Sequence, residues 1–172
     1  AASNQVRVVD TRAGKVVGQV PLQKAVREIR FSADGATAYV AASDGVRAID
    51  ATSHEVTRLL SLGDAAAIRG LGITPDGRQL LVNTGVALRT LDVASGQVVG
   101  EALQLPAGQM GCAVSDDGRF AYLAQMRDKA GGPGGAVVAV DLKAGSITHT
   151  VHLDNISPWA IAVAPTTKLA AR

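Results

Sequence analysis

A repeated block constrains the fold of this 172-residue chain more than any other feature of its sequence. A short apolar run that closes on an aspartate occurs four times, at 6–10, 46–50, 88–92 and 137–141. The closing aspartates are spaced 40, 42 and 49 residues apart, and a turn sequence and a second apolar run follow each of them. A fixed period of this length is typical of repeat architectures, in which each unit buries its faces against its neighbours.

A second element recurs with the same period. It has the form Ser/Thr-x-Asp-Gly and occurs at 32–35, 74–77 and 115–118, each time between two short apolar runs. Asp-Gly between such runs predicts a tight β-hairpin, because glycine accepts the positive φ that these turns require. A fourth copy at 164–167 lacks the Asp-Gly.

Together the two elements define a unit of four short strands, and no stretch shows sustained helical periodicity. Four-stranded units at this period predict an all-β protein, a β-propeller with about four repeats, in which each unit is one antiparallel blade. Aromatic residues make up only 3% of the chain, so the core must be built from Val, Ile, Leu and Ala.

The predicted domain organisation is a single repeat array over 1–172. Full blades are expected at about 26–62, 68–103 and 110–152, terminal half-blades at about 6–20 and 159–170, and an inserted flexible loop at 126–135. Two arrangements remain open. The half-blades pair and close a four-blade ring, which removes exposed sheet edges, or the chain is part of a larger ring, completed by further blades or by a second chain.

These motifs resemble those of the bacterial and archaeal YVTN-type β-propeller repeats. The resemblance rests on Thr11-Arg12-Ala13-Gly14-Lys15-Val16-Val17, Ala38-Tyr39-Val40-Ala41, Thr74-Pro75-Asp76-Gly77-Arg78 and Ser157-Pro158-Trp159-Ala160-Ile161-Ala162-Val163. It implies a periplasmic or extracellular protein of the cell envelope. Similar folds occur beside quinone- or haem-dependent dehydrogenases and in lactone hydrolases, so the resemblance does not choose a function.

The start of each innermost strand is the informative position for a site. Counting five residues back from each hairpin motif gives Arg27, Arg69, Met110 and Trp159, which predicts that these four residues surround the mouth of the central channel. Two arginines, a thioether and an indole suit an anionic or planar group. An ordinary solvated rim, on which the tryptophan packs, is the simpler interpretation of the same residues. Gln109 and Asn155 are secondary members of this set.

Other residues that could carry chemistry have simpler explanations. The repeated aspartates are expected to bond to turn backbone, and Cys112 falls at a core position of an inner strand. His149 and His152 are three apart on a predicted strand and therefore point to opposite faces. The Gly-rich stretch 131–135 lacks the following Lys-Ser or Lys-Thr of a phosphate-binding loop. No metal ligands, catalytic residues or cofactor are therefore predicted.

The charge pattern narrows the partners. The net charge is only +2 with no basic cluster, which argues against nucleic acid, and no apolar run is long enough to span a membrane. The leading prediction is a non-catalytic scaffold or protein-interaction module of the envelope, with protein partners or as a subunit of a larger redox complex. The alternative is a ligand- or cofactor-binding propeller, or a lactonase-like hydrolase fragment, that uses the channel-mouth residues.

Overall fold

The computed structural model describes residues 4–63, 67–126 and 134–164, which form four antiparallel sheets. The first sheet has two strands, β1 (Gln5–Asp10) and β2 (Lys15–Pro21). The second contains β3 (Val26–Phe31), β4 (Thr37–Ala42), β5 (Gly45–Asp50) and β6 (Val56–Leu60). The third contains β7 (Gly70–Ile73), β8 (Gln79–Asn83), β9 (Ala87–Asp92) and β10 (Val98–Gln104). The fourth contains β11 (Gln109–Val114), β12 (Phe120–Gln125), β13 (Gly134–Asp141) and β14 (Ser146–Asp154).

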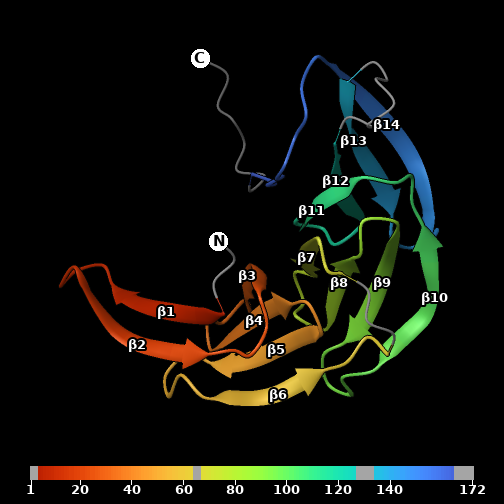
Figure 1. Ribbon diagram of the computed structural model, residues 1–172. Coiled ribbons are helices and arrows are strands. Elements are labelled where there is room, and N and C mark those ends of the chain that lie inside the picture. Colours follow the sequence, from red (N-terminus) through yellow and green to blue (C-terminus); the bar gives the residue numbers. More distant parts are fainter. Residues whose placement is uncertain (1–3, 64–66, 127–133, 165–172) are drawn as a thin grey trace, which may run out of the picture.

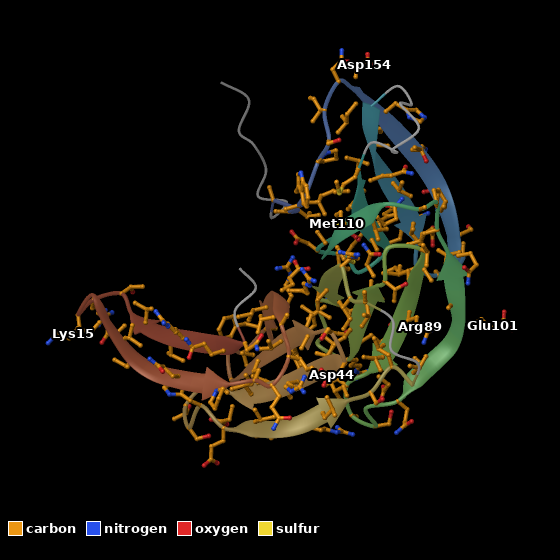
Figure 2. The ribbon with its side chains drawn as sticks, in the orientation of Figure 1. Lys15, Asp44, Arg89, Glu101, Met110 and Asp154 are labelled. Atoms are coloured by element: carbon orange, nitrogen blue, oxygen red, sulfur yellow. The ribbon has the colours of Figure 1, made fainter. Side chains whose placement is uncertain are left out.

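Each four-stranded sheet is one blade, in which the strands lie in chain order and neighbouring strands pair. The sheets fan out around a common inner side in an open arc, with β1–β2 at one end and β11–β14 at the other (Figure 1). The inner strands β3, β7 and β11 contact one another in sequence along the arc. Figure 2 shows Met110 on this inner side, whereas Glu101 lies on the outer side and Lys15 at the far tip of the β1–β2 hairpin.

The expected blade architecture is confirmed, with four-stranded sheets β3–β6, β7–β10 and β11–β14. Two differences concern the loops and the ends. Gly134 and Gly135, predicted as loop, belong to β13, and the rest of the predicted loop from 127 to 133 lies outside the described residues. No strand forms across 159–164, so this part of the predicted terminal half-blade is absent, and 165–172 lie outside the described residues.

The core is divided among the blade junctions. One apolar cluster fills the space between β1–β2 and β3–β6, a second lies between β3–β6 and β7–β10, and a third lies between β7–β10 and β11–β14. These clusters contain the aromatic side chain of Tyr39 and the thiol of Cys112, and their other side chains are aliphatic. Aliphatic side chains therefore mesh between thin sheets, as the low aromatic content predicts. No helix of the described residues has the length and apolarity that crossing a membrane requires.

The inner strands of two blades approach so closely that side chains are excluded. A Cβ at Gly70 would lie 2.3 Å from the carbonyl carbon of Gly111. The Gly111 amide also donates to the Arg69 carbonyl at 3.2 Å, which links the two blades. Glycine is therefore required here by the backbone contact itself.

At their outer strands, neighbouring sheets are joined by side-chain contacts. At the first junction, His54 of the β5–β6 turn packs on Gly18 of β2, where a Cβ would lie 2.5 Å from the His54 Nδ1. At the next junction the large residue is on the outer strand and the glycine is in the turn. Arg58 of β6 donates to the carbonyls of Val93 and Ala94, and Gly96 in the β9–β10 turn leaves room for its side chain. His54 adopts a φ of 62°, at the turn position that glycine occupies in the other repeats.

Candidate functional site

The repeated aspartates hold turns, which confirms their predicted structural role. In each Ser/Thr-x-Asp-Gly hairpin the carboxylate accepts from the backbone two residues on and from the first hydroxyl, as Asp34 does from Ala36 and Ser32. In the turns after β1, β5 and β13 the carboxylate of the closing aspartate accepts from two backbone amides, as Asp50 does from Thr52 and Ser53. These hydrogen bonds lower the pKa of both carboxyls.

The four predicted channel-mouth residues line one cavity. This cavity has a volume of about 320 Å³, and Glu28, Ile68, Gly111 and Ala160 complete its lining. A larger cavity of about 560 Å³ adjoins it and shares Arg69, Met110 and Trp159. Its other lining residues are Thr84, Gly85, Val86, Ala107, Gly108, Gln109 and Met126. We call the two cavities together the mouth.

The backbone at the mouth is fixed by bonds between blades. The Arg69 amide donates to the Asn83 carbonyl at 2.7 Å, while its carbonyl accepts from Gly111. The fully buried side chain of Asn83 donates to the Gly111 carbonyl at 2.9 Å and accepts from the Gly85 amide at 2.8 Å. Asn83 thus joins β8, β11 and the following loop, and it sets where Arg69 leaves the sheet.

The positive charges of the two arginines at the mouth are not paired with a carboxylate of the described residues. Arg27 and Arg69 are both exposed, and neither guanidinium makes a hydrogen bond or ion pair with the residues that the structure describes. Glu28 lines the same cavity, but its carboxylate pairs with Arg30 and accepts from the Leu71 amide at 2.7 Å. Burial raises the pKa of Glu28, although Arg30 and the Leu71 amide act in the opposite direction.

One polar atom at the mouth has no partner. Gln109 is fully buried, its Nε2 donates to the Pro106 carbonyl at 3.1 Å, and its Oε1 accepts no hydrogen bond from the residues that the structure describes. A buried acceptor without a donor is costly, and such groups are few in native structures. Gln109 lines the larger cavity, but this oxygen has almost no accessible surface.

Sequence reasoning located part of this site. Counting within the repeat brought Arg27, Arg69, Met110 and Trp159 to one cavity, and Gln109 lies in the larger one. Asn155, a predicted secondary member, lines neither cavity. That any of them binds a ligand or partner stays a prediction.

Other residues of the site were missed. Two of them had a signal within the repeat. Glu28 stands where the other inner strands have Gly70, Gly111 and Ala160, and Asn83 stands where the other repeats have alanine. Both are polar exceptions at small apolar positions. Thr84, Gly85, Val86 and Met126 had no such signal, because they come from loops that connect strands.

The remaining candidate residues lie outside the mouth. Cys112 is fully buried, and burial raises the pKa of its thiol to about 12, so the thiol stays protonated at neutral pH. His149 and His152 are exposed on β14. Within the described ranges no group of His, Cys, Asp and Glu has the arrangement of a metal site.

Comparisons with known proteins support the architecture. No protein-family model matches the chain, and a search of curated proteins finds no match. Among solved structures, hydrazine synthase from Kuenenia stuttgartiensis is similar, with a TM-score of 0.78 over 90% of this chain and 23% sequence identity. The chain spans about half the length of that protein, 45% of its chain. At this identity the likeness concerns the fold: the chain is an all-β protein of four-stranded propeller blades.

Proposed function

We propose that this chain is a YVTN-type propeller module of the bacterial envelope, periplasmic or extracellular, that holds a protein partner and catalyses no reaction of its own. The motif resemblance and the blade architecture support the family and the location. Propeller folds serve unrelated functions, so the role is argued from the surfaces that the arc exposes.

The observation that carries the proposal is the exposure of neighbouring apolar side chains at the β1–β2 end of the arc. At the β1–β2 end, Val9, Val16 and Val17 are 53%, 51% and 56% exposed. At the other end of the arc, Ile156, which follows β14, is 55% exposed. Neighbouring exposed apolar side chains beside an unpaired strand are typical of surfaces that another chain covers.

The similarity to a hydrazine synthase chain is consistent with the proposal that this chain is a subunit of a larger complex, which includes the case of a redox complex. Within the proposal the module would be one subunit that positions another. Copurification with a haem or quinone protein tests this version.

Site-specific photocrosslinking in the bacterial envelope tests the docking role. A photoreactive residue at Val9, on the free edge, is expected to give a discrete adduct with a partner. The same residue at Val56, which is 44% exposed on the outer strand of a complete blade, is the control and should give none. Adducts of equal yield at both positions, or none at Val9, would contradict docking at this end.

Catalysis by the purified chain is the second test. Turnover of lactones or phosphate esters that is lost on replacing Arg27 and Arg69 with alanine would overturn the non-catalytic assignment. The proposal expects no turnover above that of the variant.

A second candidate function is ligand binding at the mouth, favoured by the convergence of four channel-mouth residues on one cavity. The larger cavity is also in the size range of small-molecule sites, roughly 300–1,000 Å³. Replacing Arg27 and Arg69 with alanine should then abolish ligand binding at nearly unchanged melting temperature, and an unaltered affinity would exclude this function.

A further inference from the structure

The only tryptophan of the chain and both of its methionines lie at the mouth. Trp159, Met110 and Met126 all line the larger, 560 Å³ cavity. Two arginines, Arg27 and Arg69, line the smaller one. Tryptophan, methionine and arginine are enriched in protein–protein interfaces, and tryptophan and arginine are frequent among the residues that dominate binding energy there. The composition of the mouth is therefore that of a surface on which another protein docks.

The charge of the smaller cavity favours an acidic partner. Arg27 and Arg69 line this cavity without a side-chain partner among the described residues. Glu28, which also lines it, pairs with Arg30 on its own strand and accepts from the Leu71 amide of the next blade. With that pair counted as neutral, two positive charges remain. A carboxylate between them relieves their repulsion and accepts the short, paired hydrogen bonds that guanidinium groups donate.

The larger cavity suits a bulky apolar side chain. Val86 and Ala107 supply aliphatic surface, Met110 and Met126 supply thioethers, and Trp159 supplies an indole. Methionine is flexible and adapts its shape to the group that packs on it, and both sulfur and indole make favourable contacts with aromatic rings. A large aliphatic or aromatic side chain is therefore the group that this cavity is best suited to bury.

The apolar lining extends beyond the cavities. Val86 is 53% exposed and Trp159 is 66% exposed, so a molecule small enough to fit inside the cavities leaves much of both side chains in water. An extended protein segment covers them, because its backbone runs over the rim while its side chains enter. The rim is already fixed for this contact, since Asn83 accepts from the Gly85 amide directly before Val86. A fixed surface loses little conformational entropy when a partner binds.

The two cavities lie side by side, which sets the spacing of the two groups on the partner. Arg69, Met110 and Trp159 line both of them. In an extended chain, side chains two residues apart point to the same face and are separated by about 6–7 Å, whereas adjacent side chains point to opposite faces. An acidic residue and a large apolar residue with one residue between them can therefore enter both cavities at once.

We propose that the mouth holds an extended segment of a protein partner in which an acidic residue and a large apolar residue stand two positions apart. The carboxylate lies between Arg27 and Arg69. The apolar side chain lies against Met110 and Trp159. This inference rests on the proposed function, a module that holds a protein partner, and adds to the β1–β2 end a second contact with stated partner chemistry.

Titration of the purified chain with matched peptides tests the inference. The probe is acetyl-Gly-Phe-Ala-Glu-Ala-Phe-Gly-amide, which places a phenyl ring two positions from the glutamate in either chain direction. One control peptide has glutamine in place of the glutamate, and a second has alanine in place of both phenylalanines. Calorimetry should show each control binding about tenfold or more weakly than the probe. Because Trp159 is the only tryptophan of the chain, its emission should shift to shorter wavelength as the probe covers it.

Variants of the chain assign the two contacts. Arg27→Ala and Arg69→Ala should each weaken the glutamate probe about tenfold and change binding of the glutamine control little. The exposed turn variant Arg12→Ala is the matched control and should bind as the unaltered chain does. Trp159→Ala, followed by calorimetry, should reduce the preference for phenylalanine over alanine. Melting temperatures are measured alongside, and Arg27→Gln or Arg69→Gln replaces an alanine variant that does not fold.

The outcomes separate this inference from the function on which it rests. If the glutamine control binds as tightly as the probe, or if both arginine variants bind the probe unchanged, the inference is overturned. Phenylacetate, which has a ring and a carboxylate but no peptide backbone, should bind at least tenfold more weakly than the probe, and equal affinity would make the mouth a small-molecule site. If no peptide binds while photocrosslinking at Val9 gives its adduct, the docking function stands and this inference alone is overturned.

Discussion

Strands β1 and β5 carry nearly the same motif but differ in their surroundings. Val6–Asp10 of β1 corresponds to Val46–Asp50 of β5. In β5, Val46 is fully buried and Ile49 is 3% exposed, whereas Val9, the counterpart of Ile49, is 53% exposed. β5 lies between β4 and β6, whereas β1, among the described strands, pairs with β2 alone.

This difference shows that burial in the repeat comes from neighbouring strands and blades rather than from the strand's own sequence. β1–β2 has the outer half of a blade and packs one face on β3–β6, through Val20 and Leu22. In the described part of the chain it has no inner strand that contacts another blade, as β7 contacts β11. The apolar residues that the motif supplies to β1 therefore remain available to another chain.

The largest loss of stability is expected at the contact between the inner strands β7 and β11, for which β1–β2 has no counterpart among the described strands. Gly70→Ala places a Cβ within 2.3 Å of the Gly111 backbone, where no side chain can move aside. We expect a loss of about 3 kcal/mol or more in the free energy of unfolding. Urea denaturation measures it. A loss below about 1 kcal/mol would show that β7 and β11 are not in backbone contact.

A matched pair of truncations compares the two strands directly. Ile49→Ala removes a buried side chain and should cost about 2–5 kcal/mol. Val9→Ala removes an exposed one and should cost less than about 1 kcal/mol. Urea denaturation of both variants gives the difference, and equal losses would show that β1 is covered in the isolated chain.

The junction between half-blade and complete blade gives a third, smaller effect. Gly18→Ala forces a Cβ against His54 and should cost about 1–3 kcal/mol. His54→Gly in the same chain should restore most of that loss, because glycine also suits the φ of 62° at this turn. A double-mutant cycle measures the coupling, and strictly additive losses would contradict the contact.

The sequence predicted the blades well because a repeat reports its own boundaries. Asp-Gly hairpins and closing aspartates are local signals, and they predicted the four-stranded antiparallel unit. Position counting also brought Arg27, Arg69, Met110 and Trp159 together, because equivalent positions in successive blades face one axis. At one junction the glycine is on the outer strand and packs against a turn residue, as Gly18 does against His54. At the next it is in the turn and packs against a strand residue, as Gly96 does against Arg58. This exchange was not predictable, since it depends on contacts between repeats. Neither was the unpartnered Oε1 of Gln109, which depends on one loop carbonyl.

Acid should affect the complete blades more than the half-blade, which has no Ser/Thr-x-Asp-Gly hairpin. In those hairpins Asp34, Asp76 and Asp117 have lowered pKa values, caused first by the hydroxyl that donates to each of them. A carboxyl with a lowered pKa stabilises the fold above its unfolded value, here 3.8, and this contribution is lost as the pH falls through the folded value.

Urea midpoints as a function of pH measure this smallest effect. We expect the midpoint to fall below about pH 4, and Asp76→Ala to be less stable than the unaltered chain at neutral pH but equal to it in strong acid. Glu28 acts with the opposite sign, because its raised pKa makes its contribution fall as the pH rises above 4.5. A gap between Asp76→Ala and the unaltered chain that persists in strong acid would contradict the assignment.

Amide hydrogen exchange resolved by residue tests most directly the claim that the arc presents a free edge at β1. The free chain should exchange the β1 amides that do not bond β2 much faster than the corresponding amides of β5, which bond strands on both sides. Adding the partner identified by crosslinking at Val9 should slow the β1 amides and leave β5 unchanged. Protection of β1 equal to that of β5 in the free chain would show that the edge is already covered, and would contradict the account.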